Sequence, residues 1–238
     1  MSGLLITGTD TGVGKTWVSC HLARALVDAG LSVGVMKPCE TGMAGGPRPD
    51  ALPASSDARQ LFEASGCKAP VGDVLPYLFK LPAAPSVAAL EEGVAVEMSE
   101  LEAAFGRLNE AHDVVLVEGA GGLRVPLSPG LDYIDLAHQL DLEVLVVSRT
   151  GLGTVNHTAL TEQALLAADR APLGIVLNSP TSEVSGSDRL NLGALAHTIC
   201  TPVLAELPYG EAPPARIMRP VVDAVCEALR LSPEQETR

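Results

Sequence analysis

The sequence predicts an α/β fold in which a mostly parallel central sheet is flanked by helices on both faces. Short apolar runs alternate with helical patterns along the 238 residues, and this alternation implies parallel strands joined by right-handed crossovers. The composition is 47% hydrophobic but only 3% aromatic, which suits the aliphatic core of a parallel sheet. No linker divides the chain, so we expect residues 1–231 to form one domain and residues 232–238 a disordered tail.

Short apolar runs that end in glycine, proline or a polar residue are typical of buried strands. They span residues 4–8, 32–38, 112–119, 143–151, 173–180 and 202–210. The helical patterns span residues 14–29, 55–65, 98–111, 132–141, 154–169, 187–199 and 217–231. Residues 43–56 and 179–188 predict surface loops, and long loops in compact domains are disproportionately functional.

The first strand runs into the stretch GTDTGVGKT, which predicts a phosphate-binding loop that opens the first helix. Successive backbone N–H groups and the helix N-terminus converge on phosphates in such a loop, and Lys15 adds a point charge. Thr16 stands where a hydroxyl ligates magnesium. Thr9 occupies the position of the usual first glycine, and Gly8 comes one residue earlier. A glycine-rich turn without a ligand is the alternative, which the GKT sequence disfavours.

The second strand closes with Lys37, followed by the loop at residues 43–56 and a helix that opens near Asp57. We expect this strand next to the first one in a doubly wound sheet, where ligands collect at the carboxyl edge. The alternative for Lys37 is that its ammonium group extends outward to solvent. Asp57 is compatible with metal binding, and equally with a helix whose dipole it complements after an N-capping serine.

The strand at residues 112–119 carries Glu118 near its end, in the sequence VEGAGG. Beside a phosphate loop, this acid is placed to reach magnesium directly or through water. Gly119, Gly121 and Gly122 then allow the backbone to approach a ligand closely. The alternative is that Glu118 is only a polar turn residue.

Two further candidate binding features follow later strands of the predicted sheet, namely a loop and an asparagine side chain. Residues 150–161, TGLGTVNHTALT, follow a strand and open a helix, so their amides could receive an anion such as a carboxylate. Asn156 belongs to that site or is merely a residue of the first helical turn. Asn178 closes another strand and either reads the amino edge of adenine or forms a turn. The sequence has no [NT]KxD motif, which favours ATP over GTP.

The charge balance and the cysteines limit the classes of protein. The 16 basic and 29 acidic residues give a net charge of −13, which disfavours binding to nucleic acid. The 5 cysteines lack a CxxC pair, so we expect neither a zinc site nor disulfides but a reducing cytoplasm. The histidines lack metal-ligand spacing. No signal peptide is apparent and no apolar run approaches the roughly 20 residues that span a bilayer, so we expect a soluble protein without membrane partners.

Taken in order, the motifs GTDTGVGKT, KPCETG, SSDA, VEGAGG, GLGTVNHT and LN resemble those of dethiobiotin synthetases, over residues 4–210. The resemblance implies a homodimeric phosphate-loop NTPase that uses ATP and Mg²⁺. Its substrates would be 7,8-diaminononanoate (7,8-diaminopelargonate) and CO₂, and its products dethiobiotin, ADP and phosphate. One amine would capture CO₂ as a carbamate, ATP would phosphorylate the carbamate, and the second amine would close the cyclic urea.

The resemblance also implies roles for individual residues. The catalytic set is Lys15, Lys37 and Thr11. The magnesium set is Thr16, Asp57 and Glu118. The nucleotide set is Asp10, Gly12, Val13, Gly14, Lys15, Thr16, Trp17, Glu118, Asn178, Leu207, Pro208 and Tyr209. The substrate set is Thr41, Gly121, Gly151, Leu152, Gly153 and Asn156. The last four of these residues would bind the substrate of the other subunit, which would place the active site at the dimer interface.

The sequence departs from the family pattern at Gly12, where some members have glutamate, at Ser86, where histidine often stands, and at Glu40, an additional acid. The main alternative is a partitioning or positioning ATPase of related fold. Such switches usually carry KGGxxK, whereas Asp10 and Thr11 stand in that region here. A cobyrinate-type amidotransferase is a weaker alternative, because the chain has no room for the glutaminase domain of those enzymes.

Overall fold

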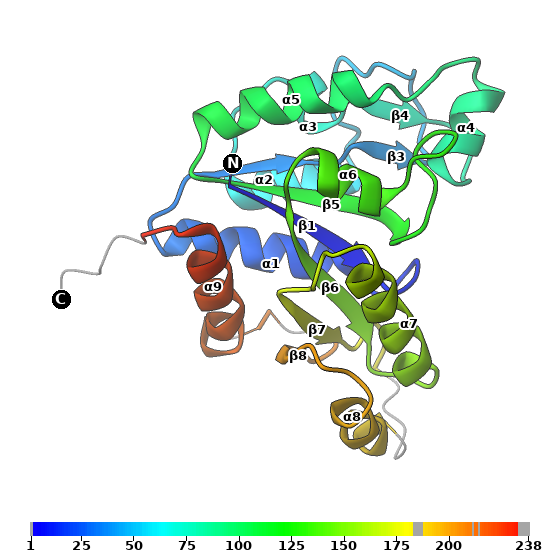
Figure 1. Cartoon of the computed structure of the whole chain (residues 1–238). Helices are drawn as coiled ribbons and strands as arrows, with labels where there is room; N and C mark the ends of the chain where they lie inside the picture. Colours follow the sequence, from blue (N-terminus) through cyan, green and yellow to red (C-terminus); the bar gives the residue numbers. More distant parts are fainter. Residues whose placement is uncertain (1, 183–187, 211, 214, 233–238) are drawn as a thin grey trace.

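A computed structural model describes residues 2–182, 188–210, 212–213 and 215–232. The main sheet has six strands in the order β2-β5-β1-β6-β7-β8 (Figure 1). Its strands are β1 (Gly3–Gly8), β2 (Val33–Met36), β5 (Val114–Gly122), β6 (Glu143–Arg149), β7 (Gly174–Asn178) and β8 (Val203–Leu207). Every neighbouring pair is parallel. Each strand predicted from the apolar runs is present, and the prediction of a mostly parallel sheet is confirmed.

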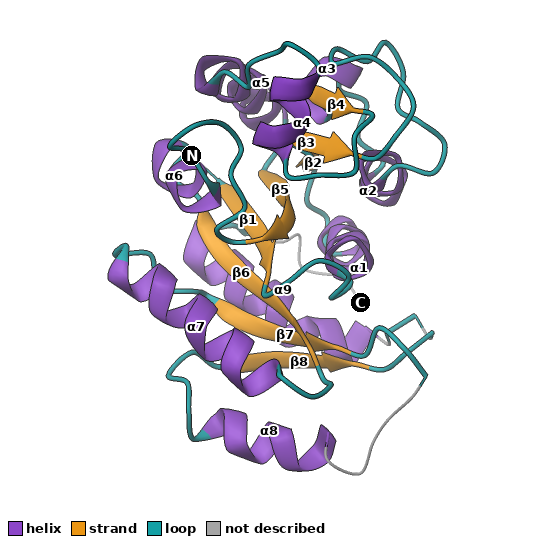
Figure 2. Cartoon of the chain, turned by 90° about the vertical axis from the view of Figure 1, so that its right-hand side faces the viewer, coloured by secondary structure: helices purple, strands orange, loops and turns teal. Residues whose placement is uncertain are grey.

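Helices cover both faces of this sheet. The predicted helical segments form α1 (Lys15–Asp28), α2 (Asp57–Ser65), α5 (Met98–Ala111), α6 (Tyr133–Gln139), α7 (Thr154–Ala167), α8 (Asp188–Ala196) and α9 (Ala215–Leu229). Figure 2 shows α6 and α7 on one side of the sheet and α1 and α2 on the other. All of β1 is buried, as expected for a central strand that is covered on both faces.

The sheet order corrects one prediction. We expected β2 to lie beside β1, but β5 lies between them, with Leu5 opposite Val117 and Val35 opposite Leu116. Residues 114–117 of β5 are apolar and at most 1% exposed. An apolar strand of this kind gains most from a central place with helices on both faces. The carboxyl end of β2, with Lys37 just after it, therefore faces the phosphate-binding loop across β5.

A second, smaller sheet was not predicted. It consists of β3 (Cys39–Thr41) and β4 (Tyr77–Phe79), accompanied by α3 (Val71–Val74) and α4 (Pro85–Glu91). This unit lies beyond the β2 edge of the main sheet (Figures 1 and 2). The loop at residues 43–56 packs against this unit and against α5, because the Arg48 guanidinium lies 4.3 Å from the Tyr77 ring centroid and 3.2 Å from a carboxylate oxygen of Glu100 on α5.

Several predictions fall partly on residues outside the described ranges. Residues 183–187 belong to the predicted loop at 179–188, residue 187 also to the predicted helix at 187–199, and residues 233–238 to the predicted tail. The domain boundary at residue 231 stays a prediction. Among the described residues, no helix combines the length and the apolar character that crossing a membrane requires.

Candidate active site

The loop between β1 and α1 has the backbone of a phosphate-binding loop. Gly12 and Gly14 have φ angles of 74° and 91°, which only glycine adopts at little cost. Gly14 is also required by space, since a Cβ there would lie 2.1 Å from Nδ2 of Asn178. No side chain caps α1 at Gly14, so the amides of its first turn are available to an anion.

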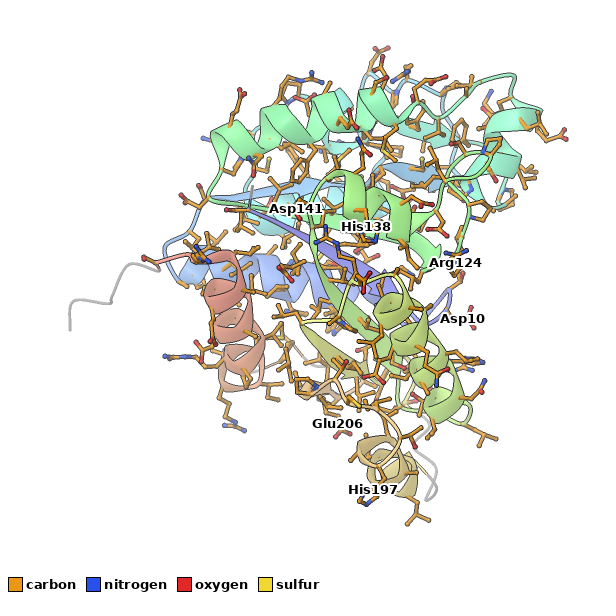
Figure 3. All side chains as sticks on the ribbon, viewed as in Figure 1. Asp10, Arg124, His138, Asp141, His197 and Glu206 are labelled. Atoms are coloured by element: carbon orange, nitrogen blue, oxygen red, sulfur yellow. The ribbon has the colours of Figure 1, made fainter. Side chains whose placement is uncertain are left out.

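Lys15 opens α1 and points into the loop. Its Nζ donates to the Asp10 carbonyl oxygen at 3.2 Å, and its side chain is buried. Burial, followed by the nearby charge of Lys37, lowers the pKa of Lys15 to about 8. Asp10 itself lies at the exposed tip of the loop (Figure 3), where one carboxylate oxygen accepts from the Thr11 amide at 2.7 Å. A phosphate near Lys15 would stabilise its charged form.

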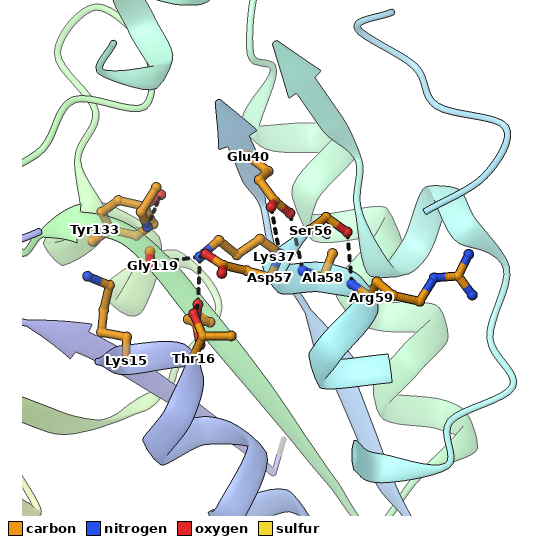
Figure 4. A network of polar contacts seen from close by, with 12 residues as sticks. Lys15, Thr16, Lys37, Glu40, Ser56, Asp57, Ala58, Arg59, Gly119 and Tyr133 are labelled. Carbon is orange, nitrogen blue, oxygen red and sulfur yellow. Dashed lines mark hydrogen bonds and ion pairs between the residues drawn. The ribbon is translucent and has the colours of Figure 1, made fainter. Parts of the chain in front are cut away.

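Lys37 holds the two acids of the predicted metal set together (Figure 4). Its Nζ lies 2.6 Å from Glu118 Oε1 and 2.9 Å from Asp57 Oδ2. Thr16 Oγ1 donates to the same Glu118 oxygen at 2.9 Å. The alternative in which Lys37 extends to solvent is therefore wrong, because Lys37 is only 2% exposed.

The charges in this cluster stabilise one another. Burial disfavours the ammonium form of Lys37, but Glu118 and Asp57 outweigh burial and raise its pKa above the ordinary value. Burial likewise disfavours the charge on Asp57, and Lys37 outweighs it, so that the pKa of Asp57 lies below the ordinary value. The described cluster is therefore an ion pair network at neutral pH.

The amides in the first turn of α2 donate hydrogen bonds to two different side chains. Ser56 is the N-cap and accepts from the Arg59 amide at 3.0 Å. Glu40, on β3, accepts from the Asp57 amide at 2.7 Å and from the Ala58 amide at 3.2 Å. Burial raises the pKa of Glu40, against the effect of these two amides. Asp57 thus takes part both in the helix start and in the ion pair with Lys37.

The residues around Glu118 fit a magnesium ion bound together with a nucleotide. Glu118 Oε2 is buried and has no hydrogen-bond partner among the residues that the structure describes. Mg²⁺ usually takes one or two carboxylates and completes its octahedron with water and substrate phosphates. Within the described ranges no group of three or more His, Cys, Asp or Glu side chains is arranged to hold a metal alone. A metal here would therefore need nucleotide oxygens as well.

A cavity of about 810 Å³ opens at this edge of the sheet. The predicted site residues that line it are Thr11, Gly12, Gly14, Lys15, Thr16, Trp17, Lys37, Thr41, Asp57, Gly121, Asn178 and Tyr209. Residues that sequence reasoning missed also line it, namely Glu40, Met43, Ser55, Ala120, Ser179, Pro180 and Gly210. Several of these flank predicted site residues or lie in the long loop at 43–56, which is the signal that could have found them.

Other predicted site residues do not line the cavity. They are Asp10, Val13, Glu118, Leu207, Pro208, Gly151, Leu152, Gly153 and Asn156. Glu118 lies behind the cavity wall, where it accepts hydrogen bonds from Lys37 and Thr16, and these two residues line the cavity. Val13 is buried and accepts, through its carbonyl oxygen, a hydrogen bond from Asn178 Nδ2 at 2.9 Å.

The loop at residues 150–153 lies apart from the cavity, at the start of α7. Gly153 is the N-cap of α7 with φ of 92°, and no side chain caps the helix there. The side chain of Leu152 is 81% exposed. Arg149 donates to the Leu152 carbonyl oxygen at 3.5 Å. The loop therefore exposes an apolar side chain next to a helix start that no side chain caps.

Comparison with solved structures identifies the fold. The chain resembles the MinC:MinD cell division protein complex of Aquifex aeolicus, with a TM-score of 0.56, 13% identity and 99% of each chain covered. A ParA family ATPase from Chlorobium tepidum TLS has a TM-score of 0.53 and 15% identity, over 98% of this chain and 95% of that one. At such low identity these likenesses concern the fold alone, and they confirm a phosphate-loop NTPase fold.

Sequence comparison goes further. The family model of an AAA domain matches residues 2–213. An ATP-dependent dethiobiotin synthetase of Anaeromyxobacter sp. (strain K) is 46% identical over 209 residues, which is 88% of this chain and 91% of that protein. The protein of the same name from Aquifex aeolicus (strain VF5) is 42% identical, over 79% of this chain and 80% of its own. The chain therefore belongs to the ATP-dependent dethiobiotin synthetase family.

Proposed function

We propose that this ATP-dependent ligase of biotin biosynthesis converts 7,8-diaminononanoate and CO₂ into dethiobiotin, with hydrolysis of ATP to ADP and phosphate. One observation carries the proposal: the side chains of Lys15 and Lys37 line the same cavity, each buried and each next to the predicted phosphate position. Two cations at one small cavity suit a reaction between two anions, the carbamate and ATP, which otherwise repel one another.

The chemistry needs no nucleophilic side chain. The substrate amine adds to CO₂ and loses a proton, which leaves an anionic carbamate oxygen. That oxygen attacks the γ-phosphorus while the bond to ADP breaks, and the second amine then attacks the carbonyl carbon and expels phosphate. Lys15 and Lys37 would stabilise the charge that spreads over the transferred phosphoryl group, and Thr11 would donate a hydrogen bond to it.

Thr16, Asp57 and Glu118 would hold Mg²⁺, which supplies charge neutralisation on the β- and γ-phosphates when bound. The unpartnered Oε2 of Glu118 supports this role, since a buried carboxylate oxygen otherwise pays for its desolvation without a partner. Before a metal enters, Lys37 provides the positive charge between the two acids.

The nucleotide would lie across the amides of residues 10–17, with its base toward β7 and β8. Trp17 is 38% and Tyr209 53% exposed, and both line the cavity. Exposed aromatic side chains beside a phosphate-binding loop suit a base or a ribose. Asn178, which lines the cavity, would read the edge of adenine, and Leu207 and Pro208 would border the base.

We further propose a homodimer in which Gly151, Leu152, Gly153 and Asn156 receive the substrate carboxylate for the partner's site. These residues do not line the cavity of their own chain. Leu152 and Leu160 are 81% and 56% exposed at the start and outer side of α7, which suits a surface covered by a second copy. Mixing the Lys37→Ala and Asn156→Ala variants tests this: activity should return on mixing, and mixtures as inactive as their components would exclude shared sites.

We place the enzyme in the cytoplasm, which supplies ATP and keeps thiols reduced. Cys20, Cys39, Cys67, Cys200 and Cys226 are all free in the structure. Free cysteines suit a reducing compartment.

The decisive experiment supplies ¹³C-bicarbonate, ATP, Mg²⁺ and 7,8-diaminononanoate and determines the mass of the product. A cyclic urea that carries the label is expected, in a yield equal to the ADP formed. The competing function is a switch ATPase of related fold. ATP hydrolysis that membranes or DNA stimulate, and that diamine and bicarbonate leave unchanged, would favour the switch and exclude the synthetase.

A further inference from the structure

Glu40 is the one acid of the cavity wall whose function remains open. It is 6% exposed and lines the cavity, yet both of its carboxylate oxygens accept from backbone amides, those of Asp57 and Ala58. Because both oxygens are engaged, Glu40 is poorly placed to bind a substrate ammonium group. Its contacts are directed at α2 instead (Figure 4).

The stability of α2 alone does not account for Glu40. Ser56 already caps this helix in the usual manner, through the Arg59 amide. A serine N-cap is local and uncharged, and it is among the most favourable caps. Glu40 adds a buried charge from a different strand to the first amides of the same helix, and burying a charge is costly unless it is paired or fully hydrogen-bonded. The arrangement therefore points to a role of Glu40 in holding Asp57 in position.

Asp57 is held at both ends by one short segment of chain. Its amide donates to Glu40, and its carboxylate receives the Lys37 ammonium group at 2.9 Å. Glu40 belongs to β3, where it pairs with Leu78 of β4, so its backbone is fixed by a strand. The direction in which the Asp57 carboxylate leaves the helix is thus set relative to Lys37.

We infer that Glu40 is a positioning residue, which fixes the N-terminus of α2 so that the Asp57 carboxylate faces the magnesium site. This inference rests on the proposed role of Asp57 as a magnesium ligand. Residues that orient metal ligands through hydrogen bonds typically change metal affinity by about 10- to 100-fold when they are replaced.

The test measures Mn²⁺ binding by electron paramagnetic resonance, with a non-hydrolysable ATP analogue bound. Glu40→Gln keeps the size of the side chain but removes its charge and one of its two acceptors. We expect it to weaken Mn²⁺ binding by about tenfold or more, while analogue binding in EDTA stays at the wild-type level. Glu40→Asp keeps the charge but is too short for both amides, so its effect should lie between wild type and Glu40→Gln.

The matched control is Ser56→Ala, which removes the other cap of the same helix without touching Asp57. We expect it to lower the melting temperature and to leave Mn²⁺ affinity unchanged. If Ser56→Ala weakens Mn²⁺ binding as much as Glu40→Gln does, the effect comes from fraying of α2, and the inference is wrong.

Asp57→Asn separates this inference from the metal assignment on which it rests. If Asp57→Asn weakens Mn²⁺ binding but Glu40→Gln stays within about twofold of wild type, Glu40 has no positioning role. If Asp57→Asn has no effect, the metal assignment of Asp57 fails and the inference with it. In the double variant, Glu40→Gln should add little to Asp57→Asn, because both act through one carboxylate; full additivity would contradict the inference.

Discussion

Replacing Lys37 by methionine removes a buried positive charge while keeping the length of the side chain. The ammonium group lies 2.6 Å from Glu118 and 2.9 Å from Asp57, and Glu118 is 0% exposed. Methionine fills nearly the same volume, so packing changes little. The variant therefore isolates the cost of leaving the buried acid without its cation.

Breaking a buried ion pair by removing one partner typically costs about 3–5 kcal/mol. For a chain of this size, each kcal/mol lowers the melting temperature by about 2–4 °C, so we expect Lys37→Met to melt about 6–20 °C below wild type. Urea unfolding at pH 7 and calorimetry measure the two quantities. The control is Arg219→Met, whose ion pair with Asp223 is exposed on both sides and should contribute less than about 1 kcal/mol.

The difference between wild type and Lys37→Met should also depend on pH. In the wild type, the pKa of Asp57 lies below its ordinary value, so its stabilising contribution is present at neutral pH and is lost only as the pH falls through that lowered value. In the variant, Asp57 has lost the cation that lowers its pKa, so most of this contribution is absent.

The gap in stability should therefore be largest above about pH 4, near the ordinary pKa of an aspartate, and should narrow as the pH falls below it. A gap below about 1 kcal/mol at pH 7, or one that does not narrow between about pH 5 and about pH 3, would refute the view that Lys37 balances buried carboxylates.

Three further outcomes follow from the site. The pKa of Lys15 is about 8 in the free protein, so ATP affinity in EDTA should stay constant below that pH and weaken above it, with proton uptake on binding. Calorimetry in buffers of different ionisation enthalpy detects the proton uptake. An ATP affinity that does not change with pH would contradict the prediction. Gly14→Ala should abolish ATP binding, and its loss of stability should be partly relieved by Asn178→Ala, which removes the colliding amide; unchanged ATP binding would disprove the close approach. Glu118→Gln should raise the Mg²⁺ requirement of turnover without changing ATP binding in EDTA, and an unaltered Mg²⁺ titration would favour a structural role.

The sequence predicts the main sheet and its helices because these elements are long enough for apolar periodicity to appear. It does not predict β3 and β4, whose three residues each are too few for a period-2 pattern. It also cannot give the place of β5 between β1 and β2, because several strand orders satisfy the same alternation of strands and helices. That order depends on which strand gains most from burial on both faces.

The phosphate-binding loop could be predicted because its residues are contiguous and each has a local reason to be there. Glu40 could not, since its partner amide at Asp57 lies 17 residues away and no local pattern marks an acid that caps a distant helix. From the sequence it is only an unexpected charge in KPCETG. The sequence also does not predict that Glu118 is buried beneath Lys37. The expected strand ends at residue 119, whereas β5 continues past Glu118 to Gly122.

The hydrogen bond from Asn178 to the Val13 carbonyl oxygen has a consequence for how the base would be read. That bond engages one N–H of Nδ2 at 2.9 Å, and the amide keeps its second N–H as a donor and Oδ1 as an acceptor. The bond therefore fixes the plane of the amide without deciding between a base that donates and one that accepts. Because Val13 belongs to the predicted phosphate-binding loop, a movement of that loop would also turn the side chain that we propose to read the base.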